Sequence, residues 1–164
     1  MIELISATPS ERAAANNIPM AVSSFTVPCR EKTPIPRAIT TAATNAPTLW
    51  HKGSFEHGVI EALAPAEADL VLDKNTSSAF NSTGIEWLLR NMHMDTLVVL
   101  GMATDMCVET TARDAADRGF NVIIVEDASA TFFERHHRAA LSGFARVFGQ
   151  VWTTERVLGA LAKS

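Results

Sequence analysis

Short aliphatic runs alternate with helix-length amphipathic segments from about residue 66 to the end of the chain. The aliphatic runs are apolar on both faces: DLVLD (69–73), TLVVLGM (96–102), NVIIVE (121–126) and VWTT (151–154). Strands of this kind that alternate with helices are typical of a parallel sheet covered on both sides. The sequence therefore predicts an α/β fold with three α/β/α layers around a mainly parallel sheet, Rossmann-like in outline.

The segments between these runs have the period of helices. Ser82 can cap a helix whose apolar residues fall three and four apart, namely Ile85, Leu88, Leu89 and Met92. A second helix is predicted from Asp105 to Arg118, with Gly119 as its stop. A third is predicted near residues 134–148, and a short helix closes the chain.

The first 65 residues have a less regular pattern. A capping box at Thr8–Glu11 predicts a short helix that ends near Asn17, before a strand at MAVSSFTV (20–27). Residues 28–53 hold four of the seven prolines and are predicted to form a long loop or an assembly arm. A further helix is predicted to start at Ser54. With 164 residues, the chain is predicted to form a single domain.

Charge and composition exclude several classes of protein. The net charge is −4 and the pI is about 5.7, so the basic excess of a phosphate-neutralising nucleic-acid binder is absent. No apolar run approaches the ~20 residues that span a bilayer. The N-terminus has no basic region followed by an apolar one, and two cysteines make no disulfide framework. We expect a cytoplasmic protein that binds neither nucleic acid nor membrane.

Two polar positions follow predicted strands. Cys107 lies in the first turn of a predicted helix, just after the strand at 96–102, where unpaired N–H groups and the helix dipole favour a thiolate. Lys74 ends the strand predicted at 69–73. Ligands of open α/β sheets bind beyond the carboxyl ends of strands, so both side chains are expected at one rim. The alternatives are a small buried cysteine and a solvated lysine.

These two segments together resemble the isochorismatase-like cysteine hydrolases, a superfamily of nicotinamidases, N-carbamoylsarcosine amidohydrolases and ureido-amidases. The resemblance runs from about Ser54 to Leu161. One motif is Lys-x-x-x-Ser-Ala-Phe at residues 74–80, and the other is Gly-x-Ala-Thr-Asp-x-Cys-Val at residues 101–108.

The resemblance implies a covalent mechanism for cleaving a C–N bond of a small amide or ureido compound. Cys107 would attack the carbonyl carbon and form a thioester that water hydrolyses, with Lys74 as a second catalytic residue. Backbone N–H groups of Ala103 and Cys107 would form the oxyanion hole, and the Met102–Ala103 peptide would be cis. Pocket-lining or supporting roles are expected for Ser78, Phe80 and Thr104, and further aromatic lining for Trp50, Phe132 and Phe133.

The chain departs from the family at its N-terminus. The family's third catalytic residue is an Asp at the end of a first, central strand, and no segment here matches that strand. Either the given start is incomplete, which we expect, or MIELIS (1–6) takes its place without an Asp. Among possible substitutes, Asp105 is expected to cap its helix and Asp73 to point away from Lys74. Asp127, at a strand end, is the least poor replacement.

No metal and no cofactor are predicted. The segment that carries a His-containing metal site in nicotinamidases reads FTVPCREKTPIPR here, without a histidine. The five histidines of the chain are expected on the surface or in loops. Cys29 is expected to be a loop thiol. A homodimer or homotetramer is expected, assembled through residues 28–53.

Three other functions stay open at this point. Isochorismate-type vinyl-ether hydrolysis uses the same scaffold and would release no ammonia. A catalytically impaired family member could serve as a binding or assembly subunit, which the missing Asp favours. A generic nucleotide-binding α/β domain is disfavoured, because no glycine-rich phosphate motif follows any predicted strand.

Overall fold

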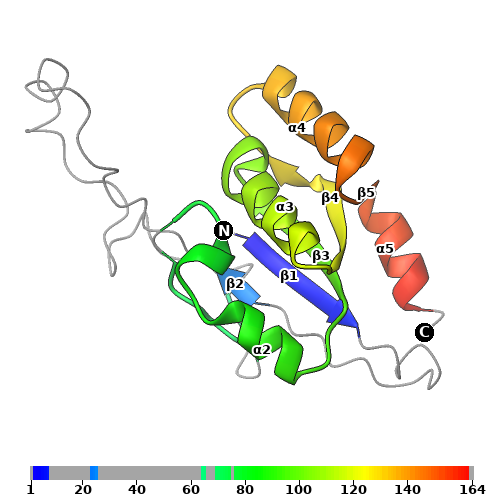
Figure 1. Cartoon of the computed structure of the whole chain (residues 1–164). Helices are drawn as coiled ribbons and strands as arrows, with labels where there is room; N and C mark the ends of the chain where they lie inside the picture. Colours follow the sequence, from blue (N-terminus) through cyan, green and yellow to red (C-terminus); the bar gives the residue numbers. More distant parts are fainter. Residues whose placement is uncertain (1, 8–22, 26–63, 66–68, 75, 163–164) are drawn as a thin grey trace, which may run out of the picture.

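The computed structural model describes residues 2–7, 23–25, 64–65, 69–74 and 76–162. Five strands form one sheet in the order β2-β1-β3-β4-β5. Their bounds are Ile2–Ala7 (β1), Ser23–Phe25 (β2), Thr96–Met102 (β3), Asn121–Ala130 (β4) and Gln150–Trp152 (β5). Helices cover both faces (Figure 1), so the predicted α/β fold is confirmed.

The helices connect the strands in the predicted alternation. Their bounds are Ile85–Asn91 (α2), Glu109–Asp117 (α3), Glu134–Val147 (α4) and Thr154–Leu161 (α5). Two short turns precede α2 and α3, namely η3 (Ala79–Asn81) and η4 (Thr104–Val108). The predicted stop at Gly119 is confirmed, because its φ of 84° is one that glycine adopts without strain.

One side of the sheet, formed by β3, β4 and β5, is parallel. β3 pairs with β4 from Thr96 opposite Asn121, and β4 pairs in parallel with β5. The pairing of β3 and β4 shifts register between Val99 and Gly101 and then resumes. β4 therefore extends to Ala130, beyond the predicted end at residue 126.

β1 occupies the other side of β3 and runs antiparallel to it. Ile2 pairs with Gly101 and Ala7 with Thr96, so the beginning of β1 lies where β3 ends (Figure 1). β1 also pairs antiparallel with β2, which lies inside the strand predicted at 20–27. Residues from MIELIS thus fill the place beside β3, and β1 contains no Asp.

The strand predicted at residues 69–73 is wrong. These residues are described without strand structure, and Val71 is half exposed. An aliphatic run becomes a strand only where a neighbour completes its ladder of hydrogen bonds. β1 pairs with β2 and β3, and residues 69–74 pair with no described strand.

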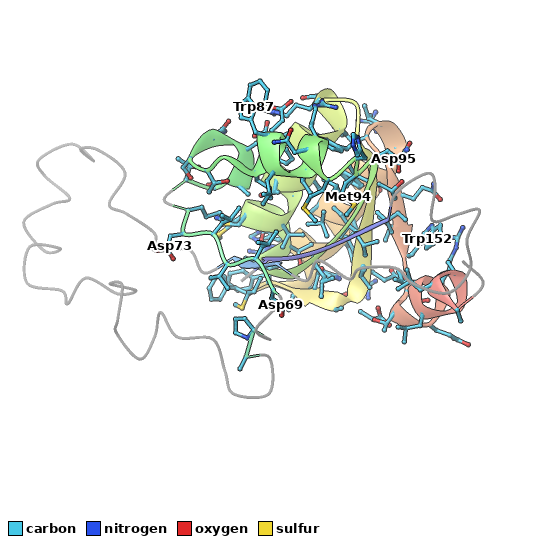
Figure 2. All side chains as sticks on the ribbon, turned by 90° about the horizontal axis from the view of Figure 1, so that it is seen from below. Asp69, Asp73, Trp87, Met94, Asp95 and Trp152 are labelled. Carbon is cyan, nitrogen blue, oxygen red and sulfur yellow. The ribbon has the colours of Figure 1, made fainter. Side chains whose placement is uncertain are left out.

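Apolar side chains form two clusters, one on each face of the sheet. The larger cluster joins β3 and β4 to α2, α3 and α4, and its fully buried members include Leu97, Val99, Val108, Ile124 and Phe144. The smaller one packs α5 against the sheet through Val98, Ile123, Val125 and Val157. In Figure 2, Met94 lies among packed side chains, whereas Trp87 projects outward from α2.

The N-terminus of α2 differs from its prediction. Its N-cap is Gly84, and Ser82 instead ends the turn η3. The hydroxyl of Thr83 accepts a hydrogen bond from the Ile85 N–H and donates one to the Ala79 carbonyl. The Thr83 hydroxyl thus binds the first N–H of the helix, and α2 starts two residues later than Ser82 predicts.

Several predictions lie outside the described residues. These are the helix at 8–17, the arm at 28–53, the helix from Ser54, and the side chains of Cys29 and Trp50. Within the part of the chain that the structure describes, no helix has both the length and the apolar character to cross a membrane.

Candidate active site

Cys107 lies in a turn that follows β3 directly. The Met102–Ala103 peptide is cis, at the position that the sequence predicts. The turn η4 is of the π type: the Ala103 carbonyl accepts hydrogen bonds from the Met106 N–H (3.1 Å) and the Val108 N–H (3.2 Å). In an α-helix that carbonyl would bond the Cys107 N–H instead. The wider turn thus leaves the Cys107 N–H without its α-helical acceptor.

The surroundings of Cys107 suit a reactive thiol. Its side chain is partly buried and packs against the larger apolar cluster. The chain continues from η4 into α3 without a break, so Cys107 lies near the positive end of a helical segment. These features place a free thiol at the carboxyl end of the parallel strands, where α/β folds bind ligands.

Lys74 is almost completely buried, with 1% of its surface exposed. Its Nζ donates to the carbonyl oxygens of Thr76 (2.8 Å) and Ser77 (3.1 Å). These two bonds stabilise the charged ammonium away from water. Asp73, the preceding residue, is exposed and lies at the outside of the domain in Figure 2.

Thr111 joins the Lys74 segment to the cysteine helix, and sequence reasoning missed it. Its buried hydroxyl accepts from the Ala79 N–H at 3.1 Å and donates to the Ser77 carbonyl at 3.5 Å. That carbonyl also accepts from Lys74. Because Thr111 is four residues after Cys107, the two lie on the same side of their helical segment. A polar residue on the otherwise apolar buried face of a helix is the signal that could have found it.

Ser78 and Phe80 have structural partners. The Ser78 hydroxyl caps η3 by accepting from the Phe80 N–H. The Phe80 ring is 9% exposed, lies 5.9 Å from the Phe120 ring and is covered by the Arg118 guanidinium. Packing accounts for these contacts, and a pocket role for either residue stays a prediction.

Asp105 does not cap its helix as expected. The N-cap residue is Ala103, with no side-chain cap. The Asp105 carboxylate instead accepts from the Thr131 hydroxyl and lies 3.5 Å from Nδ1 of His136. It points to α4 because Thr131 and His136 offer it partners across the turn.

His136 and His137 keep partly exposed side chains, in line with the surface position expected for the histidines, but both also contact the cysteine turn. Nδ1 of His137 lies 2.9 Å from the hydroxyl oxygen of Thr104, which is fully buried. Both histidines are partly buried at the start of α4, because that helix packs over η4. Thr104, predicted to line or support the pocket, is therefore held from a neighbouring helix.

Asp127, considered above as a replacement for the family's catalytic Asp, binds the first turn of α5 instead. Its carboxylate accepts from the backbone N–H of Thr154 at 2.7 Å and from the Thr154 hydroxyl at 2.9 Å. These bonds lower the pKa of Asp127 below its ordinary value. They hold it at the start of α5, which packs on the opposite face from the cluster that Cys107 contacts. Asp127 is thus a poor replacement for the family's Asp.

Four large apolar side chains are exposed around the rim where β3 and β4 end, namely Met102, Met106, Phe132 and Phe133. Phe133 lies under the Arg135 guanidinium and edge-on to His136. Among the described residues, no three His, Cys, Asp or Glu side chains gather as metal ligands. The rim therefore combines a thiol with apolar surface.

Sequence comparison places the chain in a family. The isochorismatase domain matches residues 7–156. Ureidoacrylate amidohydrolase RutB of Methylobacterium radiotolerans is 39% identical over 104 residues, which cover 63% of this chain and 40% of the relative. Nicotinamidase 3 of Arabidopsis thaliana is 38% identical over 93 residues, or 57% and 47% of the two chains. The chain spans less than half the length of these two curated relatives.

Solved structures share the fold. N-carbamoylsarcosine amidase from Thermoplasma acidophilum is similar with a TM-score of 0.66 and 28% identity, over 88% of this chain and 76% of that one. A cysteine hydrolase from Pseudomonas syringae has a TM-score of 0.67 and 31% identity, over 76% and 63%. The strand–turn–helix with its thiol and the domain match agree: this chain belongs to the isochorismatase family.

Proposed function

We propose that this chain is the core of a cysteine-dependent hydrolase that cleaves a C–N amide or ureido bond of a small molecule. The observation that carries the proposal is the π-type turn that holds Cys107 at the end of β3. The similar proteins named as amidohydrolase, nicotinamidase and carbamoylsarcosine amidase support this reaction class.

In this proposal Cys107 is the nucleophile. Its sulfur bonds to the carbonyl carbon, the C–N bond breaks, and water then hydrolyses the resulting thioester. Backbone N–H groups of Ala103 and Cys107 stabilise the oxyanion, which the missing α-helical bond at Cys107 allows. The Lys74 ammonium favours the thiolate by its charge.

The carboxylates that neighbour Cys107 in the sequence have other partners. Asp105 is engaged with Thr131 and His136, and Glu109 is engaged with Arg113. β1 beside β3 contains no Asp. Among the described residues, Asp105, Glu109 and Asp127 are thus each engaged with partners other than Cys107. The same observation favours the second candidate, an impaired member that binds or assembles without turnover.

The test is ammonia release from ureidoacrylate, nicotinamide and N-carbamoylsarcosine, with isochorismate as the vinyl-ether alternative. Cys107→Ala should abolish ammonia release and leave the far-UV circular dichroism unchanged, whereas Cys29→Ala should retain it. Intact mass spectrometry should detect an acyl adduct on Cys107 in the wild type. Turnover that survives Cys107→Ala would refute the nucleophile, and binding without an adduct would favour the impaired member.

Assembly and location belong to the same proposal. A homodimer or homotetramer in the cytoplasm stays a prediction, and sedimentation of the purified chain tests the oligomer. A small-molecule substrate is the expected partner, and the apolar rim favours one with an uncharged face.

A further inference from the structure

The start of α4 contacts the cysteine turn through two consecutive histidines. Nδ1 of His137 lies 2.9 Å from the Thr104 hydroxyl oxygen, and Nδ1 of His136 lies 3.5 Å from an Asp105 carboxylate oxygen. Thr104 and Asp105 are the first two residues of η4. The turn that carries Cys107 is therefore held from outside its own strand and helix.

The contact between His137 and Thr104 is the buried one of the two. Thr104 has no exposed surface, so its hydroxyl requires a partner within the protein. In one tautomer of His137, Nδ1 accepts a hydrogen bond from the Thr104 hydroxyl. In the other tautomer, Nδ1 donates a hydrogen bond to the hydroxyl oxygen. By comparison, the side chain of His136 is 43% exposed, and Asp105 retains Thr131 as a second partner.

Thr104 directly follows Ala103, whose carbonyl organises the π-type turn. Holding the Thr104 side chain therefore fixes the backbone between the two proposed oxyanion donors, Ala103 and Cys107. Stabilisation of a developing oxyanion depends on donors that are already in place, and small displacements reduce it. A group that holds these donors should affect the chemical step more than substrate binding.

We propose that His137 is a positioning residue of the reaction, acting through Thr104 on the turn that presents Cys107. This inference rests on the proposed function. The charged groups around His137 are Glu134 and Arg138 on its own helix, together with Asp105, which His136 faces from the same helix end. Glu134 and Arg138 pair with each other, and Asp105 pairs with Thr131, so none of them replaces the bond to Thr104.

The experiment compares His137→Ala, Thr104→Val and their double variant, using an amide that the wild type hydrolyses. Each single change should lower kcat about 10- to 100-fold and change KM by less than about threefold. The double variant should lose no more than either single one, because both remove the same bond. His137→Asn, whose amide can reach the same hydroxyl, should recover most of kcat.

Arg138→Ala is the matched control on α4, because this side chain is largely exposed and pairs only with Glu134 among the described contacts. It should keep kcat within about twofold of the wild type. Additive losses in the double variant, a loss confined to KM, or no recovery with a folded His137→Asn would each overturn the positioning role. Thermal melts identify any variant that loses its fold. If His137→Ala does not fold, the kcat of His137→Asn tests the positioning role in its place.

A second readout needs no substrate. The ratio of the Cys107 iodoacetamide reaction rate at about pH 6 to that at about pH 9 reports thiolate formation independently of access. We expect this ratio to be higher in the folded wild type than in the urea-unfolded chain. In His137→Ala the ratio should be at least about threefold lower than in the wild type, and so closer to the value of the unfolded chain. An unchanged ratio in His137→Ala overturns the positioning role alone. A wild-type ratio equal to that of the unfolded chain overturns the proposed function itself.

Discussion

The two segments that carry the candidate catalytic residues are built in different ways. Cys107 follows β3 within one continuous strand, turn and helix, and its backbone bonds are local. Lys74 belongs to no described strand, and its segment is tied to α3 through Thr111, more than thirty residues later. The backbone around Cys107 is thus built by local secondary structure, whereas the segment that carries Lys74 is joined to the domain by tertiary hydrogen bonds.

The largest expected effect comes from removing the cation. Lys74→Met keeps the length of the buried side chain and removes its charge, so kcat should fall by about 10²–10⁴-fold. The substitution also removes the hydrogen bonds that Lys74 donates to the Thr76 and Ser77 carbonyls. Steady-state ammonia release, with circular dichroism to verify folding, measures the loss. Asp73→Asn, the exposed neighbour, should stay within about twofold, and an equal loss in both variants would contradict the account.

A smaller effect should follow when the connection between the two segments is cut. Thr111→Val keeps the shape of the side chain but removes the partner of the buried Ala79 N–H. The free energy of unfolding should fall by about 1–3 kcal/mol. kcat should also fall, though by less than in Lys74→Met. Urea denaturation and turnover assays measure the two effects.

Thr110→Val is the control for this change, because it is the same substitution at the adjacent position. The Thr110 hydroxyl donates to the Met106 carbonyl in an exposed contact within the helical segment. Its loss should change the free energy of unfolding by less than about 0.5 kcal/mol. If both variants lose the same stability, Thr111 does not connect the segments in the way described.

The smallest expected effect is a change in stability when Asp127, beside α5 on the opposite face of the sheet, is replaced. The Thr154 N–H and hydroxyl lower the pKa of Asp127 in the folded state, so its carboxylate stabilises the fold above the ordinary Asp pKa of about 3.9. This contribution is lost as pH falls through the lowered value. Asp127→Asn should lower Tm at neutral pH, the difference should shrink as pH falls below the ordinary Asp pKa, and turnover should not change.

Glu126→Gln provides the comparison for Asp127, because Glu126 is the exposed preceding residue of β4. Its Tm should follow the wild type across the same pH range. A large loss of turnover in Asp127→Asn at neutral pH would show that Asp127 serves the reaction, against its position at α5.

Local sequence patterns were sufficient to predict the bounds of several strands and helices. The bounds of β3 match the predicted run of residues 96–102, and α4 begins at the predicted residue 134. In both segments the hydrophobic period and the end signals coincide within a short window. The motif at residues 101–108 likewise places Cys107 by local sequence alone.

Features that depend on partners far away in the sequence could not be predicted from local patterns. The run at residues 69–73 has the composition of a strand but pairs with no described strand. The partners of Thr111, Asp105 and Thr104 lie 26 to 34 residues away, on other elements. No local period reports such contacts, although Thr111 on an apolar helix face was a usable signal.

The central claim is that the turn after β3 makes Cys107 a reactive nucleophile, and its alkylation rate tests this most directly. At about pH 6 an ordinary thiol, with a pKa of about 8.5, is almost fully protonated. Mass spectrometry of the iodoacetamide-treated chain can follow Cys107 and Cys29 separately. The account predicts that Cys107 of the folded chain reacts at least about tenfold faster than in urea, and faster than Cys29. A folded Cys107 that reacts no faster than the unfolded one would contradict it.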